Sequence, residues 1–387
     1  MSKARDLANA GTALTTVSAT ELGYLDGVTS AVQTQINNIP QYSLPSQTGN
    51  SGKFLTTNGT AESWGSAGVT WTLRRNALTS GAFAMMAFNG TNLYVAVGSD
   101  GILETSPDGI TWTSRTSGFG TNAINAVAYA NGLWVIGGAA GNLATSTDGI
   151  TWTARTSQFG TNAIYNVKYV NSLWFALGAG GPAGGTNTGG VSYSSNGTTW
   201  TRATMTGASI GNPTDIEFAG TYYVVATAGY GANNGGYTTN LNSGWQGINI
   251  ENLGANGARI FWNGSAWIYV GDQATGTTMI STTTPPTSGT WSSLSPRLAT
   301  SEYYSLMGGV KVSGNTIYSL KNIGSNSAGN NVVLLSTPWT ITSGRFNSLG
   351  LSISAPVVGL YSYSVLCLNA SNQFVVADGQ GRIYTSF

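Results

Sequence analysis

Short apolar segments that alternate with Gly-rich and Asn-rich turns follow one another along most of the chain. One unit contains the segment Asn125–Ala130, an Asn-Gly turn, the apolar segment Leu133–Gly137, a Gly-rich loop and the segment Leu143–Ser146. Segments of this length bounded by turn residues are typical of β-strands. A short fourth segment follows the next turn, so each unit is predicted to form four antiparallel strands.

The same pair of first and second strands recurs along the chain and gives seven units in total. The six further pairs are Ala84–Phe88 with Leu93–Val97, Asn166–Tyr169 with Leu173–Leu177, Asp215–Phe218 with Tyr222–Ala226, Arg259–Trp262 with Ala266–Val270, Gly309–Val312 with Thr316–Leu320, and Ser364–Leu368 with Gln373–Ala377. A tryptophan recurs every 40 to 48 residues, at Trp71, Trp112, Trp152, Trp200, Trp245, Trp291 and Trp339. This spacing is the length of a four-stranded propeller blade. The pattern therefore predicts an all-β fold, a seven-bladed β-propeller.

Each end of this region carries an incomplete unit. Gly381–Phe387 has the pattern of a third strand with no fourth strand after it, and Val69–Leu73 has the pattern of a fourth strand with no first three before it. Pairing the two segments completes one blade and leaves no open sheet edge. We therefore expect the propeller domain to span residues 69–387, with its N- and C-terminal strands closing one blade.

The turn between the third and fourth strands is repeated almost unchanged in three units. Its residues are Ser106, Asp108, Gly109 and Trp112, then Ser146, Asp148, Gly149 and Trp152, then Ser194, Asn196, Gly197 and Trp200. An Asp or Asn side chain can accept bonds from backbone amides two residues on, and Gly can adopt the positive φ of the turn. We interpret these residues as structural rather than as ligand-binding. The turns resemble the Asp-box, or BNR, repeat of sialidase-like propellers. They are one residue shorter, a variant that resembles the turns of bacterial and phage surface proteins.

Composition narrows the class of protein. The chain has 54 Gly, 7% charged residues and a net charge of +1, which is typical of an extracellular or virion β-protein rather than a cytosolic enzyme. No basic cluster is present to bind phosphates, so no nucleic-acid partner is expected. The chain has no apolar stretch of membrane-spanning length and no signal peptide at Met1–Asp6, so we expect no membrane insertion and assembly in a host cytoplasm.

Catalysis is constrained by the absence of histidine, which excludes Ser-His-Asp and Cys-His catalysis and most zinc sites. Nothing in the spacing of the acids selects a catalytic pair from Asp215, Glu217, Glu251, Asp272 and Glu302. The Arg-Ile-Pro segment of the sialidase family is absent, so the resemblance assigns no catalytic residue. We expect no enzymatic activity, no metal and no cofactor. A glycan-degrading tailspike is the enzyme alternative.

Four other residues are assigned structural roles. Arg74, Arg115 and Arg155 each lie three residues after a recurring tryptophan. This regular placement indicates a repeat feature that contacts neighbouring outer strands. The single cysteine, Cys367, falls in a predicted first strand and is expected to be a small buried hydrophobe.

Residues 1–68 have a different composition from the rest of the chain. Ser18–Glu21 and Ser30–Gln33 have the form of capping boxes that open short helices. An apolar stripe runs along these predicted helices and consists of Leu22, Leu25, Val32 and Ile36. So short a stripe needs partner chains to cover it. The segments 19–36 and 52–60 resemble the stalks of bacteriophage tail fibres, which are trimeric. The resemblance implies a homotrimer whose residues 1–17 dock on other virion tail proteins.

The two halves together lead us to expect a phage tail fibre or spike subunit, located in the virion, that binds a host surface receptor. A glycan is favoured over a protein because polar uncharged loops with interspersed aromatic rings suit sugars. The long loops fall on the propeller face opposite the Asp-box turns, the distal face. The predicted receptor-binding residues are Tyr230, Asn233, Asn234 and Tyr237. The other alternative is a purely structural virion protein, a capsid fibre or baseplate component.

Overall fold

The chain divides into two compact units, Met1–Ala67 and Gly68–Phe387. The computed structural model describes residues 54–57, 62–65, 72–76, 78–180, 189–205, 210–228, 233–249, 258–271, 278–281, 283–293, 310–313, 316–323, 331–338, 349–352, 365–368, 374–377 and 381–385. The predicted trimerisation residues and one predicted receptor residue lie outside these ranges, namely Leu22, Leu25, Val32, Ile36 and Tyr230.

The described part of the first unit is a β-hairpin. Strand β1 (Phe54–Thr57) pairs antiparallel with β2 (Glu62–Gly65), and Phe54 lies opposite Gly65. This hairpin falls in the segment that resembles phage stalks. The short helices predicted for residues 18–36 lie outside the described residues.

The described residues of the second unit form seven four-stranded antiparallel sheets. Six of them follow the chain: β4 (Phe83–Phe88), β5 (Tyr94–Gly98), β6 (Leu103–Ser106) and β7 (Thr113–Ser114); β8 (Ile124–Ala130), β9 (Leu133–Gly138), β10 (Leu143–Ser146) and β11 (Thr153–Arg155); β12 (Ile164–Val170), β13 (Leu173–Gly178), β14 (Gly190–Ser194) and β15 (Thr201–Arg202); β16 (Asn212–Ala219), β17 (Tyr222–Ala228), β18 (Gly235–Thr238) and β19 (Gln246–Ile248); β20 (Ala258–Trp262), β21 (Trp267–Gly271), β22 (Thr278–Ser281) and β23 (Ser292–Ser293); β24 (Val310–Ser313), β25 (Thr316–Ile323), β26 (Asn331–Pro338) and β27 (Leu349–Ser352). These strands lie where the repeated pattern predicts them.

The seventh sheet combines both ends of the second unit. Its strands are β28 (Val365–Leu368), β29 (Phe374–Ala377), β30 (Ile383–Thr385) and β3 (Thr72–Arg75). Thr72 lies opposite Thr385, and Leu73 lies opposite Tyr384. The terminal segments therefore pair as expected; the predicted residues 69–71 lie outside the described part of the chain.

In the three repeated turns the tryptophan belongs to the turn and not to the fourth strand. Strand β7 starts at Thr113, and the Trp112 indole Nε1 donates to the Gly109 carbonyl at 3.1 Å. This bond holds the ring against the turn. The paired strand therefore begins only after the tryptophan.

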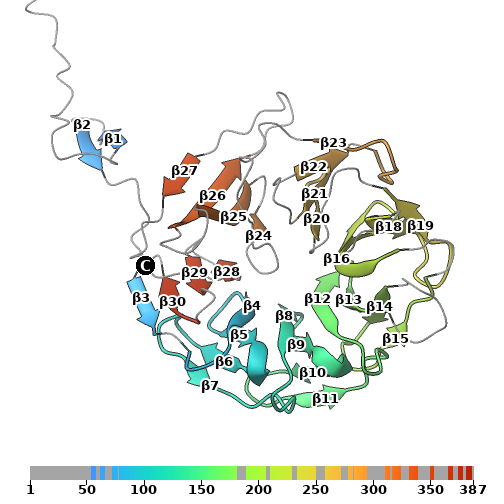
Figure 1. Cartoon of the computed structure of the whole chain (residues 1–387), viewed down its shortest axis with the longest axis horizontal. Coiled ribbons are helices and arrows are strands. Elements are labelled where there is room, and N and C mark those ends of the chain that lie inside the picture. The colour runs from blue at the N-terminus through green and yellow to red at the C-terminus, as the bar shows by residue number, and fades with distance from the viewer. Residues whose placement is uncertain are drawn as a thin grey trace, which may run out of the picture. The chain divides into compact units, whose positions relative to one another are not determined.

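The first strands of the sheets lie next to one another. Contacts join β24 to β28, β28 to β4, and then β4, β8, β12, β16 and β20 in succession. Figure 1 shows these inner strands toward the centre of the second unit and the fourth strands toward its outside. The start of each first strand, the turn between second and third strands and the last residue of each fourth strand share one end of a sheet, which we call the distal end.

The core lies between neighbouring sheets. Trp134 and Trp174 are fully buried at equivalent positions of second strands. Val95 of β5 packs in one cluster with Val127 of β8, in the next sheet. Cys367 is 2% exposed in β28 and packs with apolar neighbours, which confirms its prediction as a buried hydrophobe.

An ion pair links the terminal strand β3 to the first sheet. Arg75 donates from Nε to Glu104 Oε2 at 2.9 Å and from Nη2 to Oε1 at 2.7 Å. Its Nη1 donates to the Gly381 carbonyl at 3.1 Å. Glu104 is only 5% exposed, so these bonds replace most of its contact with water. Arg75 therefore connects β3, the approach to β30, and β6.

We expect Arg75→Ala to lower the free energy of unfolding by about 2 kcal/mol or more, because it leaves the Glu104 carboxylate buried without its counter-charge. Urea unfolding followed by tryptophan fluorescence measures this loss. Arg115→Ala is the matched control, since Arg115 donates from Nε to a neutral acceptor, Thr105 Oγ1, at 2.9 Å. Equal losses for the two variants would show that the Arg75 ion pair contributes nothing beyond an ordinary hydrogen bond.

Candidate functional site

The three repeated turns, which we call the Asp-box turns after their sequence resemblance, share one hydrogen-bond network. Asp108 Oδ1 accepts from the backbone amides of Ile110 and Thr111, both at 2.8 Å. Ser106 Oγ donates to the same oxygen at 3.0 Å and accepts from the Gly109 amide at 2.8 Å. Ser146, Asp148, Gly149 and Trp152 repeat these bonds.

The third turn shows what this network requires. Asn196 Oδ1 accepts from the amides of Thr198 and Thr199, both at 2.9 Å. Gly197 has φ of +74°, and the Trp200 indole donates to its carbonyl. An amide oxygen thus replaces the carboxylate without changing the turn, so the network needs one well-placed oxygen rather than a charge. These contacts are the backbone bonds that the sequence predicts.

The predicted receptor residues do not form one exposed set. Asn234 is 8% exposed, and its backbone carbonyl accepts from the buried Tyr269 hydroxyl at 3.1 Å. Tyr237 lies within β18 and packs edge-on against Tyr222, with ring centroids 5.9 Å apart. The Asn233 side chain lies over the Gly247 backbone. A receptor role for these residues stays a prediction.

Charged residues gather instead on the inner strands of three successive sheets. The strand registers align Met85, Ala126, Asn166, Asp215 and Arg259 at one position of the first strands. Two residues further on, they align Ala87, Ala128, Lys168, Glu217 and Phe261. Strands β4 and β8 therefore carry apolar residues where β12, β16 and β20 carry mostly polar or charged ones. We call Asn166, Lys168, Asp215, Glu217, Arg259 and Phe261 the inner-strand cluster.

Asp215 is the buried centre of this cluster. Its Oδ1 accepts from Lys168 Nζ at 3.1 Å and from the Ile216 amide at 2.9 Å, and its Oδ2 accepts from the Ile260 amide at 3.1 Å. Its side chain is only 3% exposed. Asp215 therefore joins β12, β16 and β20 through its carboxylate.

Lys168 and Glu217 form the partly exposed ion pair of the cluster. Lys168 Nζ lies 3.2 Å from Glu217 Oε2, and the two side chains are 25% and 23% exposed. Burial lowers the pKa of Lys168, but the attraction of Asp215 and Glu217 outweighs it, so the pKa is raised and the ammonium is charged at neutral pH. The ammonium also lies 5.8 Å from the centroid of the Phe261 ring.

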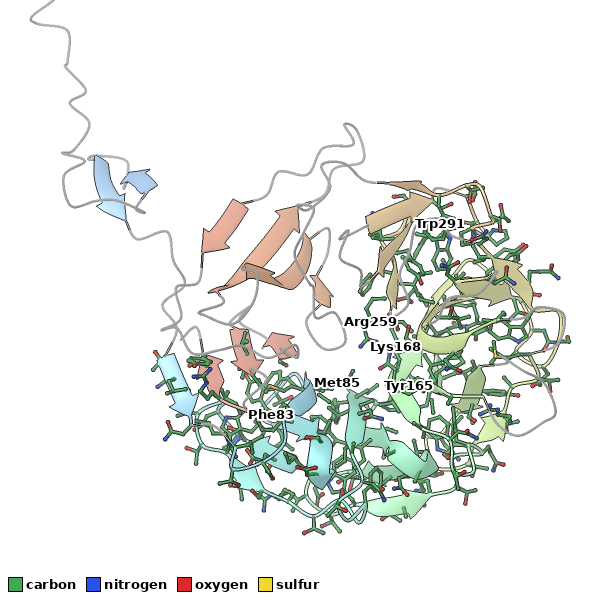
Figure 2. All side chains as sticks on the ribbon, viewed as in Figure 1. Phe83, Met85, Tyr165, Lys168, Arg259 and Trp291 are labelled. Atoms are coloured by element: carbon green, nitrogen blue, oxygen red, sulfur yellow. The ribbon has the colours of Figure 1, made fainter. Side chains whose placement is uncertain are left out.

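Side chains of the inner strands also donate to backbone carbonyls of a neighbouring inner strand. Asn125 Nδ2 donates to the Ile164 carbonyl at 2.8 Å, and Asn166 Nδ2 donates to the Thr214 carbonyl at 2.9 Å. Arg259 Nη1 donates to the same Thr214 carbonyl at 3.0 Å. Figure 2 shows Lys168 and Arg259 at the inner side of their sheets. These bonds fix the cluster to the scaffold.

The arrangement suits binding better than proton transfer. Both oxygens of Asp215 are occupied by donors, and Glu217 is paired with an ammonium, so neither is placed as a neutral general acid. Within the described residues, no group of three or more His, Cys, Asp or Glu is placed to hold a metal ion. No helix in the described part of the chain has the length and hydrophobicity needed to cross a membrane.

Sequence reasoning missed Lys168 and left the acids unpaired. Asp215 and Glu217 were candidates without a partner, because the lysine that joins them comes from the preceding unit. If the units are aligned on their second strands, Lys168 and Glu217 occupy the same position of their first strands. This alignment would have indicated the lysine as a partner of the acids. The predicted role of Arg74, Arg115 and Arg155 is confirmed, because each donates from Nε to a threonine of the adjacent third strand.

Comparison with solved structures supports the fold. The chain is similar to YCF48 bound to D1 peptide, with 15% identity, coverage of 82% of this chain and 94% of that one, and a TM-score of 0.58. It is similar to the WD40 β-propeller domain of Doa1, with 10% identity, coverage of 82% and 96%, and a TM-score of 0.53. At these identities the likeness shows an all-β, propeller-like fold and nothing of function. No family model matches the chain, and no curated protein matches it.

We expect the Asp-box network to make stability depend on acid pH. Bonds from the Thr151 and Ile150 amides and from Ser146 lower the pKa of Asp148 from 3.8 to about 2. A lowered folded-state pKa contributes stability that is present above the unfolded pKa and is lost as the pH falls through the folded value. Thermal melts from about pH 4 down to about pH 2 should therefore show a falling midpoint.

Asp148→Asn is the matched variant, because Asn196 shows that the amide keeps the turn. We expect its melting midpoint to fall less steeply over the same pH range than that of the parent chain. Identical slopes would show that Asp148 ionisation does not contribute to folding.

Proposed function

We propose that this chain is a subunit of a bacteriophage tail fibre or spike. Its N-terminal segment forms a homotrimer and docks on the virion, and its second unit is a closed seven-bladed propeller that binds a glycan on the host surface. The seven four-stranded sheets and the pairing of β3 with β30 support the closed ring. The likeness of residues 15–66 to phage stalk segments supports the assignment to a fibre.

The inner-strand cluster is the observation that carries the binding function. In a chain with 7% charged residues, four charged side chains of neighbouring inner strands come together there. A sugar needs donors and acceptors for its hydroxyl groups and an apolar surface for its ring. Lys168 offers an ammonium, Glu217 a carboxylate, and Phe261 a ring beside them.

The geometry favours binding over glycan degradation. A glycosidase needs one carboxyl group that is kept protonated and a second one that acts on the sugar. Asp215 is held by donors on both oxygens, and Glu217 accepts from Lys168 and from the Phe218 amide. Oxygens that accept these bonds are not placed to donate a proton. The pair therefore lacks the acid that the reaction requires.

Retention on a panel of immobilised bacterial surface polysaccharides tests the proposal. We expect the full chain to be retained by at least one of them, and Glu217→Gln to weaken retention about tenfold, because the amide loses the charged acceptor. Arg155→Gln is the matched control, since Arg155 bonds Thr145 on an outer strand, away from the inner-strand cluster.

Two results would contradict this proposal. Retention on no polysaccharide, together with tight binding to another virion protein, would favour the structural alternative. Release of oligosaccharides from a retained polysaccharide would favour the tailspike alternative, and loss of this release in Glu217→Gln would place the activity in the cluster.

The trimer has a separate test in the full chain. Replacing Leu25 and Val32 with Asp puts charges into the predicted apolar stripe, and we expect the mass measured by light scattering to fall from that of a trimer to that of a monomer. The melting of the propeller should be unchanged. A variant that remains trimeric would show that the interface lies outside this stripe.

A further inference from the structure

One arginine departs from the pattern of the repeat. Arg74, Arg115 and Arg155 donate from Nε to Thr385, Thr105 and Thr145 at 2.7 to 2.9 Å. Arg202 follows its tryptophan by two residues instead of three. It lies opposite Ser192 in the register of β14 and β15, whereas Arg155 lies opposite Leu143. A shift of one residue moves a side chain to the other face of a sheet.

The surroundings of Arg202 are partly apolar. Its guanidinium lies 4.5 Å from the centroid of the Phe159 ring. A Cβ at Gly190 would lie 2.7 Å from Arg202 Nη2 and 2.6 Å from Phe159 Cε1, so glycine at this position makes room for the stacked pair. Within the described residues, no carboxylate forms an ion pair with Arg202.

Two polar atoms at this position lack partners. Arg202 Nη1 is buried and has no hydrogen-bond acceptor among the described residues, and the same holds for Ser192 Oγ. Ser192 is fully buried, and as a cross-strand pair the two side chains project from the same face of the sheet. A buried cation without a counter-charge and a buried hydroxyl without a bond both reduce stability.

Arg202 and its neighbours lie toward the distal face. Arg202 is the last residue of β15, Gly190 is the first residue of β14, and Phe159 lies in the connection from β11 to β12. All three therefore lie at the distal ends of their sheets. Arg202 as a whole residue is half-buried, whereas its Nη1 is buried.

We propose that Arg202 and Ser192 form a binding site for an oxyanion, a carboxylate or phosphate group carried by the receptor glycan. The guanidinium presents planar N–H donors that match two oxygens of such a group, and the serine hydroxyl supplies a further donor. Stacking on Phe159 fixes the plane of the guanidinium before the ligand arrives. This inference rests on the proposed receptor function and adds that the receptor is acidic.

Calorimetric titration of the full chain with sodium glucuronate, inorganic phosphate and neutral methyl glucoside tests the site. We expect saturable binding of at least one anion and none of the neutral sugar. Arg202→Gln should weaken anion binding about tenfold or more, the factor expected for losing a charge-assisted hydrogen bond. Arg155→Gln removes the same charge from the preceding sheet and should leave binding unchanged.

Stability gives a second readout. Because no carboxylate of the described residues pairs with Arg202, Arg202→Gln should melt at the same temperature as the parent or higher, and added anion should raise the midpoint of the parent only. If this variant does not fold, Arg202→Lys replaces it, since it keeps the charge but loses the planar donors and should bind more weakly.

The outcomes separate this site from the proposed function. Glucuronate binding indicates an acidic sugar, and binding of phosphate alone indicates a phosphate-bearing polymer; both support the oxyanion site. Equal anion binding by parent and Arg202→Gln overturns it, and so does the absence of anion binding by the parent. If the parent is nevertheless retained on a polysaccharide, only the Arg202 site fails and the receptor function stands.

Discussion

The backbone pairing of β3 with β30 is the contact on which the second unit depends. It joins residues about as far apart in the chain as the unit allows, since the Arg74 to Thr385 bond spans 311 positions. Without β3, β30 would present an unpaired edge that invites aggregation. The same short strand carries Arg75, whose ion pair with Glu104 reaches the first sheet. One strand thus completes the last sheet and ties it to the first.

A feature of this structure is predictable from the sequence when the residues that form it lie close together in the chain. An Asp-box turn is contained within seven residues, so the pattern from Ser106 to Trp112 predicts its bonds. The two terminal strands are far apart in the sequence, yet their pairing was predictable. The last unit lacks a fourth strand, and the segment before the first unit has the pattern of one. The inner-strand cluster was not predictable from any single unit, because Lys168 and Asp215 belong to different sheets. The burial of Asn234 was not predictable from its own unit either, because its carbonyl accepts a bond from Tyr269, in the next sheet.

The scarcity of charge makes each described ion pair informative. Surface salt bridges contribute little to the free energy of unfolding, so a low content of charged residues costs little stability. The described pairs are instead partly or largely buried and connect different sheets: Arg75 with Glu104, and Lys168 with Asp215. Buried pairs cost desolvation energy that geometry must offset. Arg75 offsets this cost with a two-pronged contact, and Asp215 offsets it with backbone donors from two strands. Such pairs specify which sheets are neighbours.

The sheets differ in their turns and in the residues of their inner strands. The two sheets from β4 to β11 keep both the Asp-box carboxylate and apolar inner positions, such as Ala126 and Ala128. The sheets from β16 to β23 have lost the box and carry charged inner positions, including Asp215 and Arg259. The sheet from β12 to β15 lies between them, with Asn196 in its turn and Arg202 displaced to the opposite face. The hydrogen bonds of the turn network join residues within each turn. The sheets can therefore keep the same fold while the residues at the inner strands and distal ends differ. The departures from the repeat are therefore the places where binding chemistry is to be sought.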